Sequence, residues 1–150
     1  MSTIKVDTYL TRGGASEIAI DKLKGVTAAG SMLVVGEGGT NTTNLQQGLA
    51  KAWINMDGSG TVGISDSFNV SGISDDGTGQ YQLQIATDMA NADYSATTGL
   101  TRGGLANISF IDAGADWNAT TGTVGFITAD NNNSAFDPDC ITITVHGDLA

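Results

Sequence analysis

The side chains best suited to nucleophilic chemistry are a single histidine and a single cysteine, His146 and Cys140. They lie in a segment that reads as a β-strand, and at about 3.3 Å per residue their separation along a straight strand is roughly 20 Å. A nucleophile and its base must lie within hydrogen-bond reach, so we expect no catalytic pair here. One histidine and one cysteine are also too few for an ordinary zinc site.

Carboxylate and amide side chains gather in two predicted loops, where their oxygens could bind calcium. These side chains are Asp75 and Asp76 in the first loop, and Asp130, Asn131, Asn132, Asn133, Asp137 and Asp139 in the second. Neither loop has the spaced acids, central Gly and distal Glu of a calcium-binding helix-loop-helix. Asp and Asn also stabilise turns by bonding to nearby backbone. We prefer this interpretation, with calcium as the alternative, and expect no cofactor and no metal site.

Two tryptophans, Trp53 and Trp117, are candidates for stacking on sugars. Trp117 lies in a loop rich in Gly, Asp and Asn, so we expect it to be exposed and take it as the candidate contact for a glycan or a partner. Trp53 lies in a predicted strand, with Ala52 and Ile54 on the opposite face. Large aromatic side chains are usually buried in a core or an interface, and we predict such a structural role for Trp53.

The composition indicates a folded, all-β domain. The chain has 150 residues, of which 40% are hydrophobic and 15% charged, a balance typical of one folded domain and not of a disordered chain. With 21 Gly and a single Pro, it favours turns and half-exposed strands over long helices. The single cysteine excludes an intrachain disulfide, so the fold must be stable without one.

The net charge of −10 repels phosphate backbones and anionic lipid headgroups, so we expect neither nucleic acid nor a membrane surface as a partner. The charge is uneven: residues 1–51 hold five bases and four acids, whereas residues 52–150 hold one base and twelve acids. Either the early segment contacts another surface while the later part faces solvent, or it simply lacks the acidic surface of a domain. The sequence leaves both explanations open.

From residue 49 onward, short strands alternate with Gly- and Asp-rich turns. Strands at residues 50–56 and 61–68 flank a turn at 57–60, which predicts a hairpin. A second hairpin is predicted at residues 68–74 and 80–85. Further strands are predicted at residues 94–101, 106–111, 123–129 and 141–146.

Two of these strands alternate cleanly between apolar and polar residues. The predicted buried rows are Tyr81, Leu83 and Ile85 in one strand and Ile141, Ile143 and Val145 in the other. One buried and one wet face is typical of antiparallel sheets. About eight strands at such spacing predict an antiparallel β-sandwich, jelly-roll-like in its strand number.

Residues 1–48 differ from this pattern, because glycines interrupt their apolar stretches. We predict an extended N-terminal arm over residues 1–48, used for anchoring or oligomerisation, and a β-sandwich domain over residues 49–150. The arm cannot bury its apolar side chains alone, so we expect them to lie against its own domain or a neighbouring subunit; the alternative is a floppy leader. The predicted arm contacts are Ile4, Val6, Tyr9, Ile18, Ile20 and Leu23.

We expect no signal peptide, because the opening MSTIKVDTYLTRGG has no apolar core of about seven or more residues. No apolar run in the sequence approaches the length of a membrane span. We therefore expect the chain to be made and first folded in a cytoplasm.

The run AKAWINMDGSGTVGISDSFNVSGISDDGTGQYQLQIATDMANADYS, which begins at residue 50, resembles a module of tail-fibre-like and other virion proteins of tailed bacteriophages, many of them marine or cyanobacterial. The likeness lies in Ala-Lys-Ala-Trp at residues 50–53, Ser-Phe-Asn-Val-Ser at residues 67–71, and Asp-Gly-Thr-Gly at residues 76–79. The opening MSTIKVDT and the residues 145–148 are also similar to such proteins. The sequence departs from them at Asp75 and Asp76 and over residues 98–140.

The resemblance implies a structural virion protein with no catalytic residues. Our leading hypothesis is a homotrimeric fibre or spike-like appendage, bound to other virion proteins and contacting a glycan on the host surface. A capsid decoration protein is the second hypothesis, and a carbohydrate-binding module outside any virus is the third. We expect no enzymatic activity.

Overall fold

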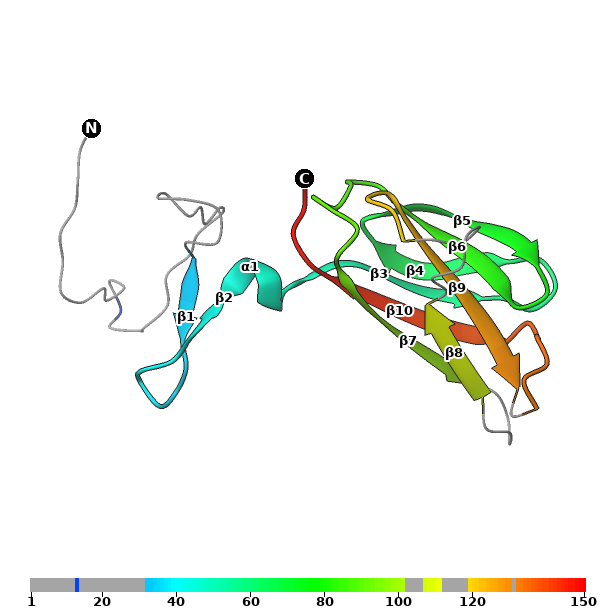
Figure 1. Cartoon of the computed structure of the whole chain (residues 1–150), viewed down its shortest axis with the longest axis horizontal. Coiled ribbons are helices and arrows are strands. Elements are labelled where there is room, and N and C mark those ends of the chain that lie inside the picture. Colours follow the sequence, from blue (N-terminus) through cyan, green and yellow to red (C-terminus); the bar gives the residue numbers. More distant parts are fainter. Residues whose placement is uncertain (1–12, 14–31, 102–106, 112–118, 131) are drawn as a thin grey trace.

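The computed structural model describes residues 13, 32–101, 107–111, 119–130 and 132–150. Eight of its strands form two four-stranded antiparallel sheets that face each other (Figure 1). The first sheet has the order β4-β3-β10-β7 and the second β5-β6-β9-β8. The all-β, antiparallel sandwich predicted from the sequence is therefore confirmed.

The strands of the first sheet are β3 (Ala50–Asp57), β4 (Gly63–Phe68), β7 (Ser95–Thr101) and β10 (Cys140–His146). The strands of the second sheet are β5 (Val70–Gly77), β6 (Gln80–Ile85), β8 (Asn107–Ile111) and β9 (Thr123–Asp130). All eight were predicted, with small differences at their ends. The predicted hairpins are confirmed as the antiparallel pairs β3–β4 and β5–β6. The first and last strands of the body, β3 and β10, pair at the centre of the first sheet.

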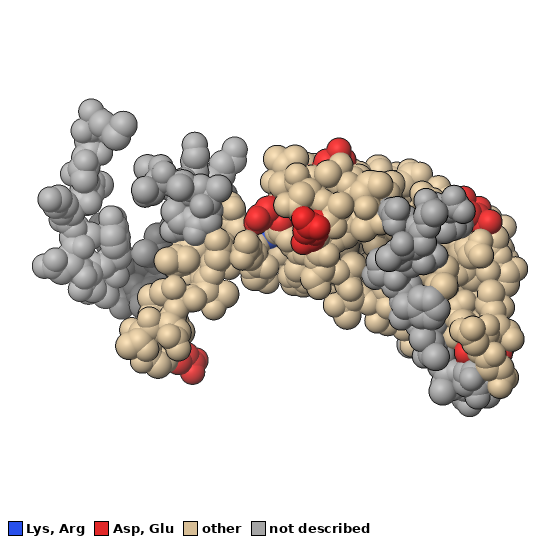
Figure 2. Space-filling view, in the orientation of Figure 1, with Lys and Arg blue, Asp and Glu red and all other residues tan. Residues whose placement is uncertain are grey.

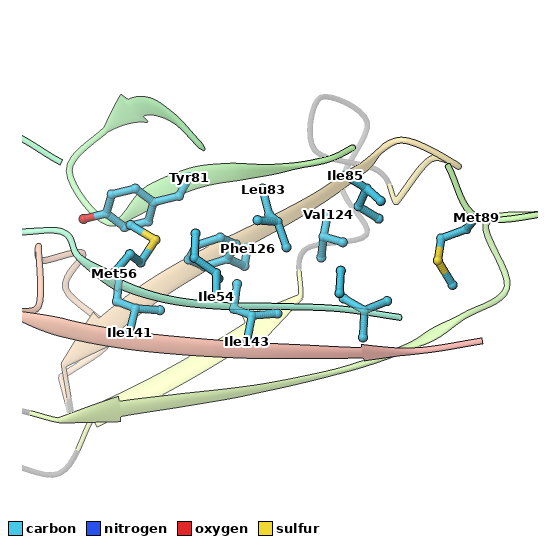
Figure 3. Close-up of a cluster of buried hydrophobic side chains, with 12 residues drawn as sticks. Ile54, Met56, Tyr81, Leu83, Ile85, Met89, Val124, Phe126, Ile141 and Ile143 are labelled. Atoms are coloured by element: carbon cyan, nitrogen blue, oxygen red, sulfur yellow. The ribbon is translucent and has the colours of Figure 1, made fainter. Parts of the chain in front are cut away.

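The core is one layer of apolar side chains between the sheets (Figure 3). Both predicted rows, Tyr81 to Ile85 and Ile141 to Val145, are buried there. From the second sheet, the ring of Tyr81 stacks on that of Phe126, with centroids 5.4 Å apart and an angle of 25° between the rings. From the first sheet, Ile54 joins the same cluster. The period-2 pattern of the sequence therefore becomes two apolar faces that close on each other.

A single residue carries the chain from the first sheet to the second. Asn69 stands between β4 and β5 with φ of 55°. Its side-chain Nδ2 donates to the carbonyl of Lys51 at 2.9 Å and to that of Thr87 at 3.1 Å, and its Oδ1 accepts from the Thr87 N–H at 2.8 Å. Lys51 belongs to the first sheet and Thr87 follows β6 of the second. One amide therefore joins an inner strand of the first sheet, β3, to the segment that follows β6 of the second.

Before the body, β1 (Leu33–Val35) and β2 (Thr42–Asn44) form a two-stranded antiparallel ribbon, which we call the ribbon. It leads into α1 (Leu45–Gly48), one helical turn capped by the Asn44 side chain, which accepts from the N–H groups of Gln46 and Gln47. The ribbon was not predicted from the sequence, because three-residue strands around a Gly-rich loop are too short to show a period in their side chains. Within the described residues no helix is long and apolar enough to cross a membrane.

We expect Leu83→Ala to lower the free energy of unfolding by about 2–5 kcal/mol, because it removes buried methyl groups from a closed core. Leu83 is fully buried between the sheets. Gln80→Ala on the exposed face of the same strand is the matched control and should change stability by less than about 0.5 kcal/mol. Urea unfolding followed by tryptophan fluorescence measures both, and equal effects would contradict the assignment of the faces.

We expect Asn69→Gly to lower the free energy of unfolding by about 1–3 kcal/mol, because it deletes the hydrogen bonds between the sheets and keeps a residue that tolerates positive φ. Asn69→Ala should cost about 1 kcal/mol more, since a Cβ disfavours that conformation. Urea unfolding of the two variants separates the contribution of the hydrogen bonds from that of the backbone strain. Identical values for Gly and Ala would show that backbone strain has no part.

Candidate functional site

The two residues considered first as a nucleophile and a base stand at opposite ends of β10. Cys140 begins the strand and His146 ends it. The Cys140 sulfur lies 3.6 Å from the side-chain oxygen of Asn55, whereas His146 pairs in register with Ser95 of β7. The predicted separation of the two side chains is confirmed, so they cannot act on one substrate atom.

The acidic loops meet at the end of the sandwich away from the ribbon, which we call the distal pole. Asp57 accepts from the N–H of Ser59 at 2.8 Å and from its hydroxyl at 2.7 Å. The hydroxyl bond first, and then the backbone bond, lower the pKa of Asp57. Asp130 accepts in the same way from the N–H groups of Asn132 and Ser134. These carboxylates stabilise turns, as preferred from the sequence.

Calcium at the acidic loops gains no support from this geometry. Asp75 accepts from the N–H of Gly77 at 3.3 Å, which is a third turn bond of the same kind. Within the ranges that the structure describes, no group of three or more His, Cys, Asp or Glu is arranged to hold a metal ion. Asn131 of the predicted cluster lies outside the described residues.

Asp137 joins three loops of the distal pole. Its Oδ1 accepts from the Tyr81 hydroxyl at 2.8 Å and from the N–H of Gly79 at 2.6 Å. The N–H of Gly58 donates to the carbonyl of Pro138 at 2.9 Å, and a Cβ at Gly58 would lie 2.5 Å from the Tyr81 hydroxyl. Burial, and then the bond to Asp137, raise the pKa of Tyr81. The phenol therefore stays protonated and holds the pole closed.

The opposite end, the proximal pole, holds a recess of about 950 Å³ where the chain enters and leaves the sandwich. Its lining combines side-chain amides, three large apolar side chains, one lysine and the last residues of the chain. The lining residues are Asn44, Gln46, Gln47, Leu49, Ala50, Lys51, Phe68, Ala90, Asp148, Leu149 and Ala150. This volume is at the upper end of the range of ligand pockets, about 300–1,000 Å³.

Backbone bonds hold the C-terminal part of the recess lining in place. The N–H of Ala90 donates to the carbonyl of Asp148 at 2.8 Å, and that of Ala150 to the carbonyl of Asp88 at 2.9 Å. These bonds hold the C-terminal residues against the loop after β6. The recess is therefore bordered by segments far apart in the sequence, and no local pattern could have predicted it.

Lys51 is the one buried charged side chain among the described residues, with 8% of its surface exposed. Its ammonium donates to the carbonyl of Leu49 at 2.9 Å and to that of Gln46. A cation at the C-terminal end of a helical turn is favoured by the partial negative charge of its free carbonyl groups. The ammonium thus fixes the junction between α1 and β3 and presents little charge to the recess.

The rim of the recess continues onto the outer face of the first sheet. Phe68, which lines the recess, is 52% exposed and pairs in register with Trp53. Trp53 is half-buried and faces outwards, while Ala52 and Ile54 beside it are in the core. Burial of Trp53 in the core is therefore wrong, because the pleat of β3 turns its side chain away; a role in an interface stays a prediction.

The remaining predicted contact residues lie outside the described residues: Trp117 of the candidate glycan contact, and Ile4, Val6, Tyr9, Ile18, Ile20 and Leu23 of the arm. Their roles stay predictions. The apolar rim residues Leu49, Phe68 and Leu149 were not predicted, since each stands alone in its segment.

We expect stability to fall in alkaline solution through the tyrosines. Burial raises the pKa of Tyr94 to about 12, and its hydroxyl donates to the carbonyl of Thr123 at 2.6 Å. The folded state favours the protonated hydroxyl, whose pKa in the unfolded chain is about 10. This contribution to stability is complete below pH about 10 and is lost as the pH rises through the pKa of the folded state. Urea unfolding between pH about 8 and 12 should show the loss, with a shallower slope in Tyr94→Phe. An unchanged slope in that variant would contradict the assignment.

Comparisons with models of known protein families, with curated proteins and with solved structures gave no match to this chain.

Proposed function

We propose that this chain is a structural protein of a tailed-bacteriophage particle, a fibre or spike-like appendage that assembles as a homotrimer and displays its sandwich outwards. The observation that carries the proposal is the difference between the two poles. Exposed apolar side chains gather at the ribbon and the proximal recess, while turns rich in Asp form the distal pole. A molecule built in this way attaches at one end and faces water at the other.

The charge supports outward display. The described residues hold eleven carboxylate side chains and one base, Lys51, whose ammonium is buried against backbone carbonyls. Carboxylates are spread over the face of the body shown in Figure 2, with almost no positive charge beside them. Such a surface keeps copies soluble and repels phosphate backbones and anionic lipids. Nucleic acid and membranes are accordingly not among the proposed partners.

The resemblance to virion modules adds support from the sequence. The resembling run, from residue 50 to residue 95, corresponds to the strands β3 to β6 and the start of β7. Its Gly and Asp motifs occupy the turns of the two hairpins, and its Asn69 makes the crossing between the sheets. The residues that carry the resemblance are thus ones that form the strands and turns of the sandwich. The proposed host contact, a glycan near Trp117, rests on the sequence alone.

The chemistry of the recess favours attachment over catalysis. Its ammonium is engaged by two carbonyl groups and not by Asp148, the one carboxylate side chain of the lining. The other lining side chains are amides and apolar groups. A catalytic centre needs a nucleophile, or an acid and a base, within reach of one reacting atom. The arrangement instead offers surface for another chain.

We expect the purified full chain to give the mass of three copies in native mass spectrometry. Immunogold labelling of intact particles would then place the sandwich. Gold label on the tail or neck would support the appendage. Label spread evenly over the head would contradict the appendage and support a capsid decoration protein. A single peak at the mass of one chain over a range of concentrations would contradict self-assembly.

A further inference from the structure

We propose that the ribbon of one copy docks in the proximal recess of a second copy, in a head-to-tail contact. This inference rests on the self-association in the proposed function and names the surfaces that make it. It pairs two apolar surfaces that do not pack against the core of the sandwich, the strand β1 and the rim of the recess.

The ribbon needs a partner. Leu33, Val34 and Val35, the whole of β1, are all exposed. A two-stranded hairpin is marginal in water on its own, and it becomes stable when an apolar face packs on something else. Exposed apolar strands also promote unwanted pairing between chains unless they are covered. The ribbon is therefore expected to pack its apolar side chains against another surface.

The recess offers the complementary surface. Seven large hydrophobic side chains are exposed in the part of the chain that the structure describes; three form β1, and another three, Leu49, Phe68 and Leu149, line the recess. The seventh is Ile64 on the edge strand β4. Apolar side chains gathered around a hollow and bordered by amides are typical of a protein–protein contact.

The occupant is a second copy because the ribbon of the same chain is directed away from the body. In Figure 1 it extends from α1 on the side opposite the sandwich. Asn44 caps the start of α1 and Lys51 bonds to the carbonyls at its end, which fixes this direction. The residues of β1 are exposed in the single chain, so the body of the same chain does not cover them, and we assign that role to the recess of a second copy.

Charge favours this pairing over contact between two sandwiches. Residues 32–48, which hold the ribbon and α1, carry one charged side chain, Glu37, whereas residues 52–150 carry one base and twelve acids. Two sandwiches in contact would bring together surfaces of the same sign, and contact through the nearly uncharged ribbon avoids most of that repulsion.

A contact between two different surfaces has a consequence for symmetry. Such a heterologous contact repeats from copy to copy and closes into a ring when the rotation allows it. A trimer is one such ring. Each copy then gives one ribbon and receives one ribbon, and no recess is left open.

The test uses three single variants of the full chain. Val34→Asp alters the ribbon and Leu149→Asp the recess, and both should give only the mass of one chain in native mass spectrometry. Ile64→Asp is the matched control, because Ile64 and Leu149 are both 41% exposed and Ile64 lies outside the recess; it should keep the oligomer of the unaltered chain. Unfolding curves confirm that the sandwich is intact. Val35→Asp and Leu49→Asp replace any variant that fails to fold.

A mixture of the two monomeric variants, one of them isotope-labelled, gives the decisive result. The Leu149→Asp variant keeps an intact ribbon, which enters the intact recess of the Val34→Asp variant. No third copy can bind, because the remaining ribbon and the remaining recess are the altered ones. We expect a species of two chains, one of each kind. Association of Leu149→Asp with itself, or no mixed species, would overturn the contact. An unaltered chain that is monomeric would instead overturn the self-assembly in the proposed function.

Discussion

The two sheets are held together by one thin layer of apolar side chains, and each strand reaches that layer only with alternate residues. The layer extends from Tyr81, Met56 and Ile141 at one end to Met89 at the other, as Figure 3 shows. The described body has this one core. The places where large apolar side chains remain exposed are therefore informative, since the fold does not need them there.

The direction of the strands divides the molecule into two chemically different ends. The distal turns are closed by carboxylates that accept hydrogen bonds from nearby N–H groups, with Asp137 joining the hydroxyl of Tyr81 to the backbone of Gly79. Acidic side chains suit this role, because Asp bonds to turn backbone and stays hydrated. At the proximal end the chain enters and leaves the body, so the ends of the sheets are covered by α1 and the C-terminal residues, and this incomplete cover creates the recess.

Local pattern explains why the strands could be predicted while the recess could not. The alternation of Tyr81, Leu83 and Ile85 with glutamines is readable within six residues, and it is retained in β6. The pairing of β3 with β10 joins segments about ninety residues apart, a distance at which no period in the sequence carries information. The outward position of Trp53 depends on which face of β3 meets β6 and β9, and the rim of the recess depends on three segments meeting at one pole. Side-chain type indicates burial only once the neighbouring strands are known.

The position of Lys51 connects the fold with the proposed assembly. Burying an ammonium is costly unless it is fully hydrogen-bonded, and here the bonds go to carbonyls at the end of α1 and not to a carboxylate. The carbonyl of the same residue accepts from Asn69, which carries the chain between the sheets. Lys51 therefore links the end of α1, and with it the direction of the ribbon, to the crossing between the two sheets. In the proposed contact, the angle between the ribbon and the body of one chain sets the angle between neighbouring copies. Closure of the ring therefore depends on the fold of the single chain.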